Sequence, residues 1–218
     1  MSTAAALLDR VTEELYAQHT SDANAAGAAR RAYEERRGRV HQDDELWEAW
    51  SAAFVEWFVI ERTEDDGLPL AARTLRELPP DDPRTSAIRA LLTSQRSLFE
   101  VRAMGKTGRV ELLDLLGGAV FHVDEQRQLH GVEVGDVAEL RLIGVPTSDG
   151  GEVRFGRTFI YHPKAARGAI VERARAMLAK GASRRDVIDQ IAQLRVQVTR
   201  YRHMAPARVY ELGSRIMG

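Results

Sequence analysis

The sequence contains no cysteine among its 218 residues. This absence excludes disulfide bridges, thiolate metal sites and cysteine nucleophiles, and it fits a reducing compartment. Long apolar runs are also missing, because no stretch approaches the roughly 20 apolar residues that a membrane helix needs. The apolar run at residues 4–8 is too short for the core of a signal peptide. We therefore expect a cytoplasmic protein that makes no membrane contact.

Aromatic residues are few, at 6% of the chain, and all three tryptophans lie within residues 47–57. Large apolar side chains recur there at three- and four-residue steps, which is the pattern of a helix. We expect Asp43 or Asp44 to cap this helix, which then extends to Glu61. An aromatic face for a ligand is one interpretation. We favour a core helix, because aromatic side chains contribute large burial energies. The residues expected in the main core are Trp47, Trp50, Phe54 and Trp57.

The remaining periodicities predict an α+β protein with N-terminal helices, a five-stranded antiparallel sheet or small barrel, and C-terminal helices. The expected helices span residues 4–18, 28–37, 43–61, 70–78, 82–94, 165–180, 183–200 and 206–216. The expected strands span residues 97–104, 110–116, 119–124, 137–145 and 153–161. We divide the chain into a helical region (1–96), a β-barrel-like region (97–162) and a basic helical tail (163–218), packed together as one unit.

Charge is unevenly distributed although the net charge is only −1. Residues 164–218 contain 12 Lys or Arg and 4 Asp or Glu, a local charge of +8. Residues 40–101 contain 13 acidic and 6 basic residues, a local charge of −7. Such asymmetry indicates either a surface for an anionic partner or two parts of the chain that dock on each other. We favour docking, because the overall charge is close to zero.

No arrangement of residues predicts catalysis, a bound cofactor or a metal centre. The segment Gly105-Lys106-Thr107 lacks the first glycine of a phosphate loop, since Glu100 stands in its place, and it is expected to form a hairpin turn. A second candidate combines His122, Asp124 and His130 into a site with two histidines and one carboxylate. We interpret these three residues as the polar outer face of a sheet. The serines do not occur in a nucleophile elbow.

The leading functional hypothesis is a non-catalytic regulator or adaptor that binds another protein and sequesters or inhibits it. The alternative is a nucleic-acid-binding protein that uses the basic C-terminal helices. A homo-oligomer is also compatible with the sequence. The candidate surface for an anionic partner consists of five arginines in the tail: Arg184, Arg185, Arg195, Arg200 and Arg202.

Several segments together resemble an uncharacterised group of bacterial cytoplasmic proteins, similar to chains from deltaproteobacteria. They lie at residues 43–58, 97–101, 112–118 and 134–137. In that group an aromatic helix precedes a small β-barrel. The resemblance implies this architecture for residues 28–165 and implies no catalytic residues.

Overall fold

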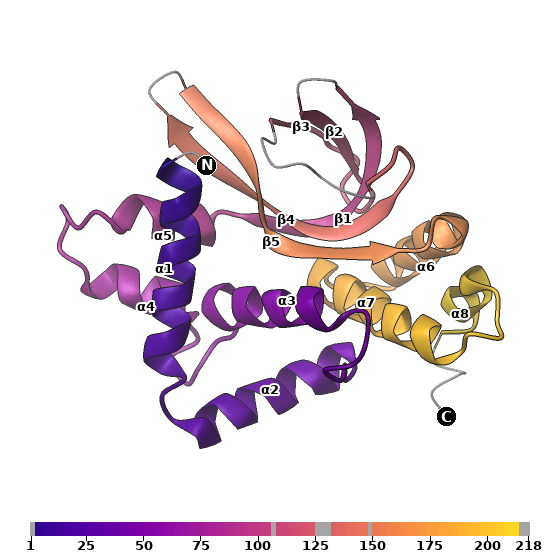
Figure 1. The fold of residues 1–218 in the computed structure, drawn as a ribbon, viewed down its shortest axis with the longest axis horizontal. Coiled ribbons are helices and arrows are strands. Elements are labelled where there is room, and N and C mark those ends of the chain that lie inside the picture. Colours follow the sequence, from indigo (N-terminus) through magenta and orange to yellow (C-terminus); the bar gives the residue numbers. More distant parts are fainter. Residues whose placement is uncertain (1–2, 106–107, 125–131, 148–149, 214–218) are drawn as a thin grey trace.

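The computed structural model describes residues 3–105, 108–124, 132–147 and 150–213 (Figure 1). These residues form an α+β protein, as the sequence predicts. None of the described helices is long and apolar enough to cross a membrane. The N-terminal helices are α1 (Thr3–His19), α2 (Ala23–Arg37), α3 (Trp47–Ile60), α4 (Leu70–Glu77) and α5 (Thr85–Leu92). The strands are β1 (Gln95–Met104), β2 (Arg109–Asp114), β3 (Val120–Asp124), β4 (Val137–Thr147) and β5 (Gly150–His162). A 3-10 turn η1 (Lys164–Ala166) leads to α6 (Arg167–Ala179), α7 (Arg184–Arg200) and α8 (Pro206–Leu212).

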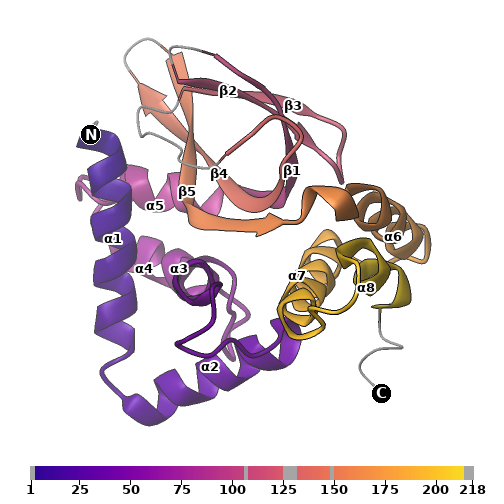
Figure 2. The same cartoon turned by 45° about the vertical axis from the view of Figure 1, so that its right-hand side comes forward.

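The five strands form one antiparallel sheet in the order β3-β2-β1-β4-β5. The sheet curves strongly, so that its edge strands β3 and β5 approach each other (Figure 2). It remains an open sheet and does not close into a barrel, which decides between the two architectures that the sequence allows. Its concave face encloses an apolar cluster that includes Phe99, Leu112, Leu140 and Phe155. Alternating strand residues therefore fill the inside of the curve.

The convex face of the sheet packs against helices from both ends of the chain (Figures 1 and 2). Leu98 and Val137 belong to a cluster that also contains buried residues of α6 and α7. Ile143 and Ile160 belong to the cluster of the N-terminal helices. The sheet thus separates an inner apolar core from a layer of helices, in which α3 packs on β5, α5 on β4 and α7 on β1.

The aromatic residues of α3 form the centre of the N-terminal core, as predicted. Trp50, Phe54 and Trp57 are buried, and the ring of Tyr33 from α2 contacts all three of them. Trp47 is only partly buried and packs at the edge of this cluster. Burial of these rings supplies a large apolar contribution to the stability of the helical layer.

Three predicted helix starts are wrong, among them that of α5, which begins at Thr85 rather than at residue 82. Helix α2 begins at Ala23 rather than at residue 28, because the side chain of Asp22 accepts hydrogen bonds from the backbone N–H groups of Asn24 and Ala25. Helix α3 begins at Trp47 without a side-chain cap. The carboxylate of Asp44 accepts a hydrogen bond from the backbone N–H of His41 instead, so it stabilises the turn that precedes the helix.

A register shift in the β4–β5 pair brings the sheet close to α3. As in a β-bulge, three residues of β5 (156–158) lie opposite a single residue of β4, Arg141. The Glu56 carboxylate of α3 accepts a hydrogen bond from the backbone N–H of Arg157 (2.6 Å) and another from the Thr158 hydroxyl (2.9 Å). A helix side chain therefore satisfies a donor that the strand ladder would otherwise use.

Candidate functional site

A buried network of charged residues lies where the N-terminal helices, the sheet and the tail meet. The guanidinium of Arg37 is 1% exposed and donates to both carboxylate oxygens of Glu139 (2.8 and 2.7 Å) and to Asp189 (2.9 Å). Arg96 donates to the same two acids, each at 3.1 Å, and to Glu61 at 3.0 Å. These residues come from α2, β1, β4, α7 and the end of α3, so the network joins all three regions of the chain.

The five arginines of the candidate anionic-partner surface all bond within the protein. Arg184 donates to Asp114 (2.6 Å), and Arg185 pairs with Glu61 (3.3 Å). Arg195 donates to Glu45 (2.9 Å) and to the Tyr161 carbonyl (2.6 Å). Arg200 and Arg202 donate to the backbone carbonyls of Arg39 (2.8 Å) and Thr199 (3.2 Å).

These arginines do not form one continuous surface. Arg184 and Arg185 lie at the first turn of α7, and Arg200 lies at its end. A helix rises about 1.5 Å per residue, so the two groups are separated by roughly 24 Å along its axis. Arg185 pairs with Glu61, and Arg195 pairs with Glu45. Both acids belong to the acidic residues 40–101, so docking of the tail on that segment requires contacts of this kind.

The structure places His122 and Asp124, the two described residues of the candidate metal site, on one exposed face of β3, each beside a different residue of β2. Asp124 is 3.4 Å from Arg109, and His122 is 4.0 Å from Glu111. Both lie exposed on β3, and His130 falls outside the described residues, as do Lys106 and Thr107 of the predicted hairpin turn. Within the described part of the chain, no group of three or more His, Asp or Glu is placed to hold a metal ion.

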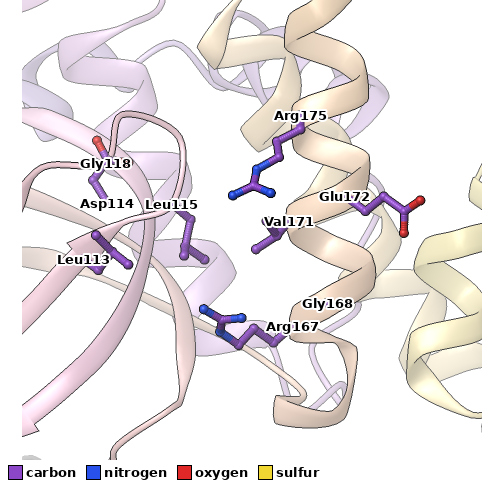
Figure 3. A pocket seen from close by; sticks show the side chains of 9 residues that line it. All are labelled: Leu113, Asp114, Leu115, Gly118, Arg167, Gly168, Val171, Glu172 and Arg175. Carbon is purple, nitrogen blue, oxygen red and sulfur yellow. The ribbon is translucent and has the colours of Figure 1, made fainter.

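A hollow that suits a ligand lies between α6 and the turn that joins β2 to β3 (Figure 3). Its volume is about 470 Å³, within the range of roughly 300–1,000 Å³ typical of ligand sites. We call it the α6 cleft. Its lining residues are Leu113, Asp114, Leu115, Gly118, Arg167, Gly168, Val171, Glu172 and Arg175.

The sequence builds the two walls of the α6 cleft differently. One wall is the end of β2 and its turn, where Gly118 adopts a positive φ of 76° that reverses the chain. The other wall is α6, on which Arg167, Val171 and Arg175 recur at four-residue spacing and therefore share one face. Figure 3 shows the two arginines extending from α6 toward β2, whereas Glu172 points away.

The two arginines of the cleft have different environments. Arg167 donates to the carboxylate of Glu100 at 2.8 Å. Burial alone would raise the pKa of Glu100, but its hydrogen bond with Arg167 and the added charge of Arg102 hold that pKa below its usual value. Arg175 has no hydrogen-bond or ion-pair partner among the described residues. Its guanidinium is therefore available to an incoming acceptor.

Helix α6 is incompletely covered on its other side as well. A second hollow of about 300 Å³ lies between α6 and α8, lined in part by Ala169, Met177 and Lys180. Only Ile170 and Ala174 of α6 are fully buried. Apolar side chains of this helix thus face two surface hollows rather than the protein core alone.

The α6 cleft combines apolar and charged side chains. Its lining residues are three apolar residues, two glycines, two arginines and two acids. Leu113, Leu115 and Val171 offer an apolar floor, and Arg175 offers free donors at its edge. This combination suits an apolar group attached to a carboxylate.

Sequence reasoning missed both the charged network and the α6 cleft. Glu139 and Arg141 alternate with apolar residues along β4, and Glu56 lies within an aromatic helix; both are signals of buried charge. In α6, Val171 lies off the side that carries the buried residues Ile170 and Ala174, and this was a signal of a second apolar face.

Comparison of the chain with protein-family models, with curated proteins and with solved structures found no match. The geometry of the described residues therefore carries the functional argument alone.

Proposed function

We propose that this protein is a non-catalytic regulator or adaptor that binds another protein through α6. The observation that carries the proposal is the α6 cleft, where an apolar floor meets the guanidinium of Arg175, which has no partner among the described residues. The proposed partner presents an acidic segment that inserts an apolar side chain into the cleft. By holding that segment, the protein sequesters or inhibits its partner.

Charge complementarity supports an acidic partner. Helix α6 carries Arg167, Arg173 and Arg175 against a single acid, Glu172, which points away from the cleft. A carboxylate pairs with a guanidinium in a planar, bidentate geometry that adds specificity as well as energy. Such pairs at the edge of an apolar cavity accelerate association and orient the partner.

The alternative, nucleic-acid binding by the C-terminal helices, has less support. A phosphate backbone requires several basic side chains on one surface. Arg184 and Arg185 lie at the opposite end of α7 from Arg200, and each of them bonds to a group of the protein itself. We therefore treat nucleic acid as an outcome of the test rather than as a second proposal.

Selection from a random peptide library tests the proposal directly. We expect the immobilised wild-type protein to enrich peptides that combine acidic residues with a large apolar residue. R175E places a like charge at the cleft and should lower the affinity of these peptides by about tenfold or more. R202E is the matched control, because Arg202 is also exposed but lies beyond α7. Enrichment of basic peptides, or equal loss of binding in both variants, would contradict the proposal.

A further inference from the structure

A third, smaller pocket opens on the charged network. It has a volume of about 230 Å³ and lies where the end of α3, the starts of β1 and α7, and the middle of β4 come together. Four arginines line it, and Glu61 is its one acid: the arginines are Arg96, Arg141, Arg184 and Arg185. We call it the arginine pocket.

The floor of the arginine pocket is rigidly held. The side chains of Arg96 and Arg141 are 9% and 3% exposed, and both bond to the Glu61 carboxylate. Burial alone would raise the pKa of Glu61, but Arg96, Arg141 and Arg185 overcome this effect and lower the pKa to about 2. Glu61 is therefore ionised at neutral pH and fixes the guanidinium groups around it.

The mouth of the pocket keeps donors that the protein leaves unused. Arg184 bonds to Asp114 and Ser97 through Nη2 alone, and Arg185 pairs with Glu61 through Nε. The other guanidinium nitrogens of these two residues have no hydrogen-bond partner within the described part of the chain. The two side chains are 42% and 46% exposed, so a ligand can reach them.

The position of the two arginines at a helix start also favours an anion at the mouth. Arg184 and Arg185 begin the 17-residue helix α7, whose N-terminal end carries the positive end of its dipole. The acids Glu139 and Asp189 lie behind the pocket and are already bonded to Arg37 and Arg96.

We propose that the arginine pocket binds a phosphate group, either as free inorganic phosphate or as the phosphate end of a small phosphomonoester. The guanidinium fork matches the oxygens of phosphate in bidentate geometry. The pocket is smaller than the roughly 300 Å³ at which sites for larger ligands begin, so it suits the phosphate group and leaves the rest of a phosphomonoester outside. This proposal is independent of the proposed protein-binding function.

Isothermal titration in phosphate-free buffer near neutral pH tests the proposal, with inorganic phosphate and ribose 5-phosphate as probes. We expect saturable one-site binding of at least one probe. R185Q should weaken it by about 10- to 100-fold, because hydrogen bonds to charged groups carry that much free energy. R184Q should weaken it as well, and it gives a second variant should R185Q fail to fold. R202Q, which removes an exposed arginine outside the pocket, should leave the affinity unchanged.

Each arm of the experiment has a defined meaning. Equal affinity for the two probes identifies free phosphate as the sufficient ligand, and tighter binding of ribose 5-phosphate identifies a phosphomonoester. Absence of saturable binding of either probe overturns the proposal, and so does equal weakening in R185Q and R202Q. An oligonucleotide that binds more tightly than ribose 5-phosphate and loses affinity in R202Q also overturns it, in favour of nucleic acid. Peptide selection with R185Q should match wild type, so failure of this proposal leaves the protein-binding function untouched.

Discussion

Arg37 is enclosed between α2, β4 and α7, and its charge is compensated by Glu139 and Asp189. Burial favours the neutral form of its guanidinium, but these two acids and Tyr33 more than reverse this effect and raise the pKa of Arg37. Arg37 also lies over the rings of Tyr33 and Trp50. One side chain thus connects the aromatic core with the buried charges.

Replacement of Arg37 by methionine should destabilise the protein strongly. R37M keeps most of the side-chain volume but leaves two buried carboxylates without their main partner. Removing one member of a buried ion pair costs about 3–5 kcal/mol, and urea unfolding would measure the loss. R39M is the matched control, because Arg39 is 68% exposed and 3.8 Å from Glu34; it should change stability by about 0.5 kcal/mol or less. Equal stability of the two variants would contradict the role of Arg37.

His162 should make the protein sensitive to mild acid. Its ring is buried against Tyr210, to which it is hydrogen bonded at 2.8 Å. Burial, together with the charges of Arg195 and Arg37, lowers its pKa from 6.5 to about 3. Below pH 6.5 the unfolded chain takes up a proton at this site and the folded protein does not. The contribution of His162 to the free energy of unfolding is therefore fully present above pH 6.5, and it is lost as the pH falls toward 3.

The expected loss between pH 7 and pH 5 is about 2 kcal/mol, since each pKa unit corresponds to about 1.4 kcal/mol. Urea unfolding at several pH values would measure it. H162Q should flatten the profile in this range, and H203Q, which replaces an exposed histidine, should retain it. If the free energy of unfolding of the wild type did not change between pH 7 and pH 5, the folded protein would accept a proton on His162, which would contradict its lowered pKa.

At the scale of elements, the packing of β5 on α3 depends on the absence of a side chain at Gly156. A Cβ atom there would lie 2.6 Å from Glu56 Oε1 and 3.1 Å from Arg141 Cβ. The same carboxylate accepts the hydrogen bonds of the bulge in β5. Close approach of the helix and the strand, rather than an unusual backbone angle, therefore requires glycine at this position.

G156A should destabilise the protein by about 1–3 kcal/mol, the usual cost of overpacking a well-packed site. Thermal or urea unfolding would measure the change. G144A in β4 is the control, because a Cβ atom at Gly144 would meet nothing within 4 Å. If G156A and G144A have the same stability, the contact between Glu56 and β5 does not constrain the fold.

At the scale of the whole molecule, the charged network and the shared apolar clusters connect α2, α3, the sheet and α7. A region that unfolds alone would expose Arg37, Glu139 or Asp189 without its partners. The cost of such exposure opposes partial unfolding. We therefore expect the chain to unfold as one cooperative unit, in agreement with the single packed unit that the sequence predicts.

Two spectroscopic probes would test this cooperativity. All three tryptophans lie in α3, so their fluorescence reports on the N-terminal helices. Far-ultraviolet circular dichroism reports on all helices, including α6 and α7. Coincident unfolding midpoints by both probes are expected for a two-state transition. Separate midpoints would instead show that the three regions unfold as independent domains.

Much of the secondary structure could be predicted because its causes are local. Gly38 and Gly181 end helices with positive φ, and Ser183 caps α7 through the backbone N–H of Asp186, as the sequence pattern indicates. The errors at the starts of α2 and α3 are local as well, since Asp22 is a cap that went unnoticed and Asp44 caps a turn instead. The candidate site was missed because its walls are distant in sequence.

The sequence by itself determined the order of helices and strands, the burial of the α3 aromatics and the uneven charge, because periodicity, capping and composition act within a few residues. Only the tertiary structure decided how the charges pair. Arg37 meets Glu139 across 102 positions and Asp189 across 152, and no local pattern encodes such a distance. The open sheet, the α6 cleft and the arginine pocket depend in the same way on how distant elements pack.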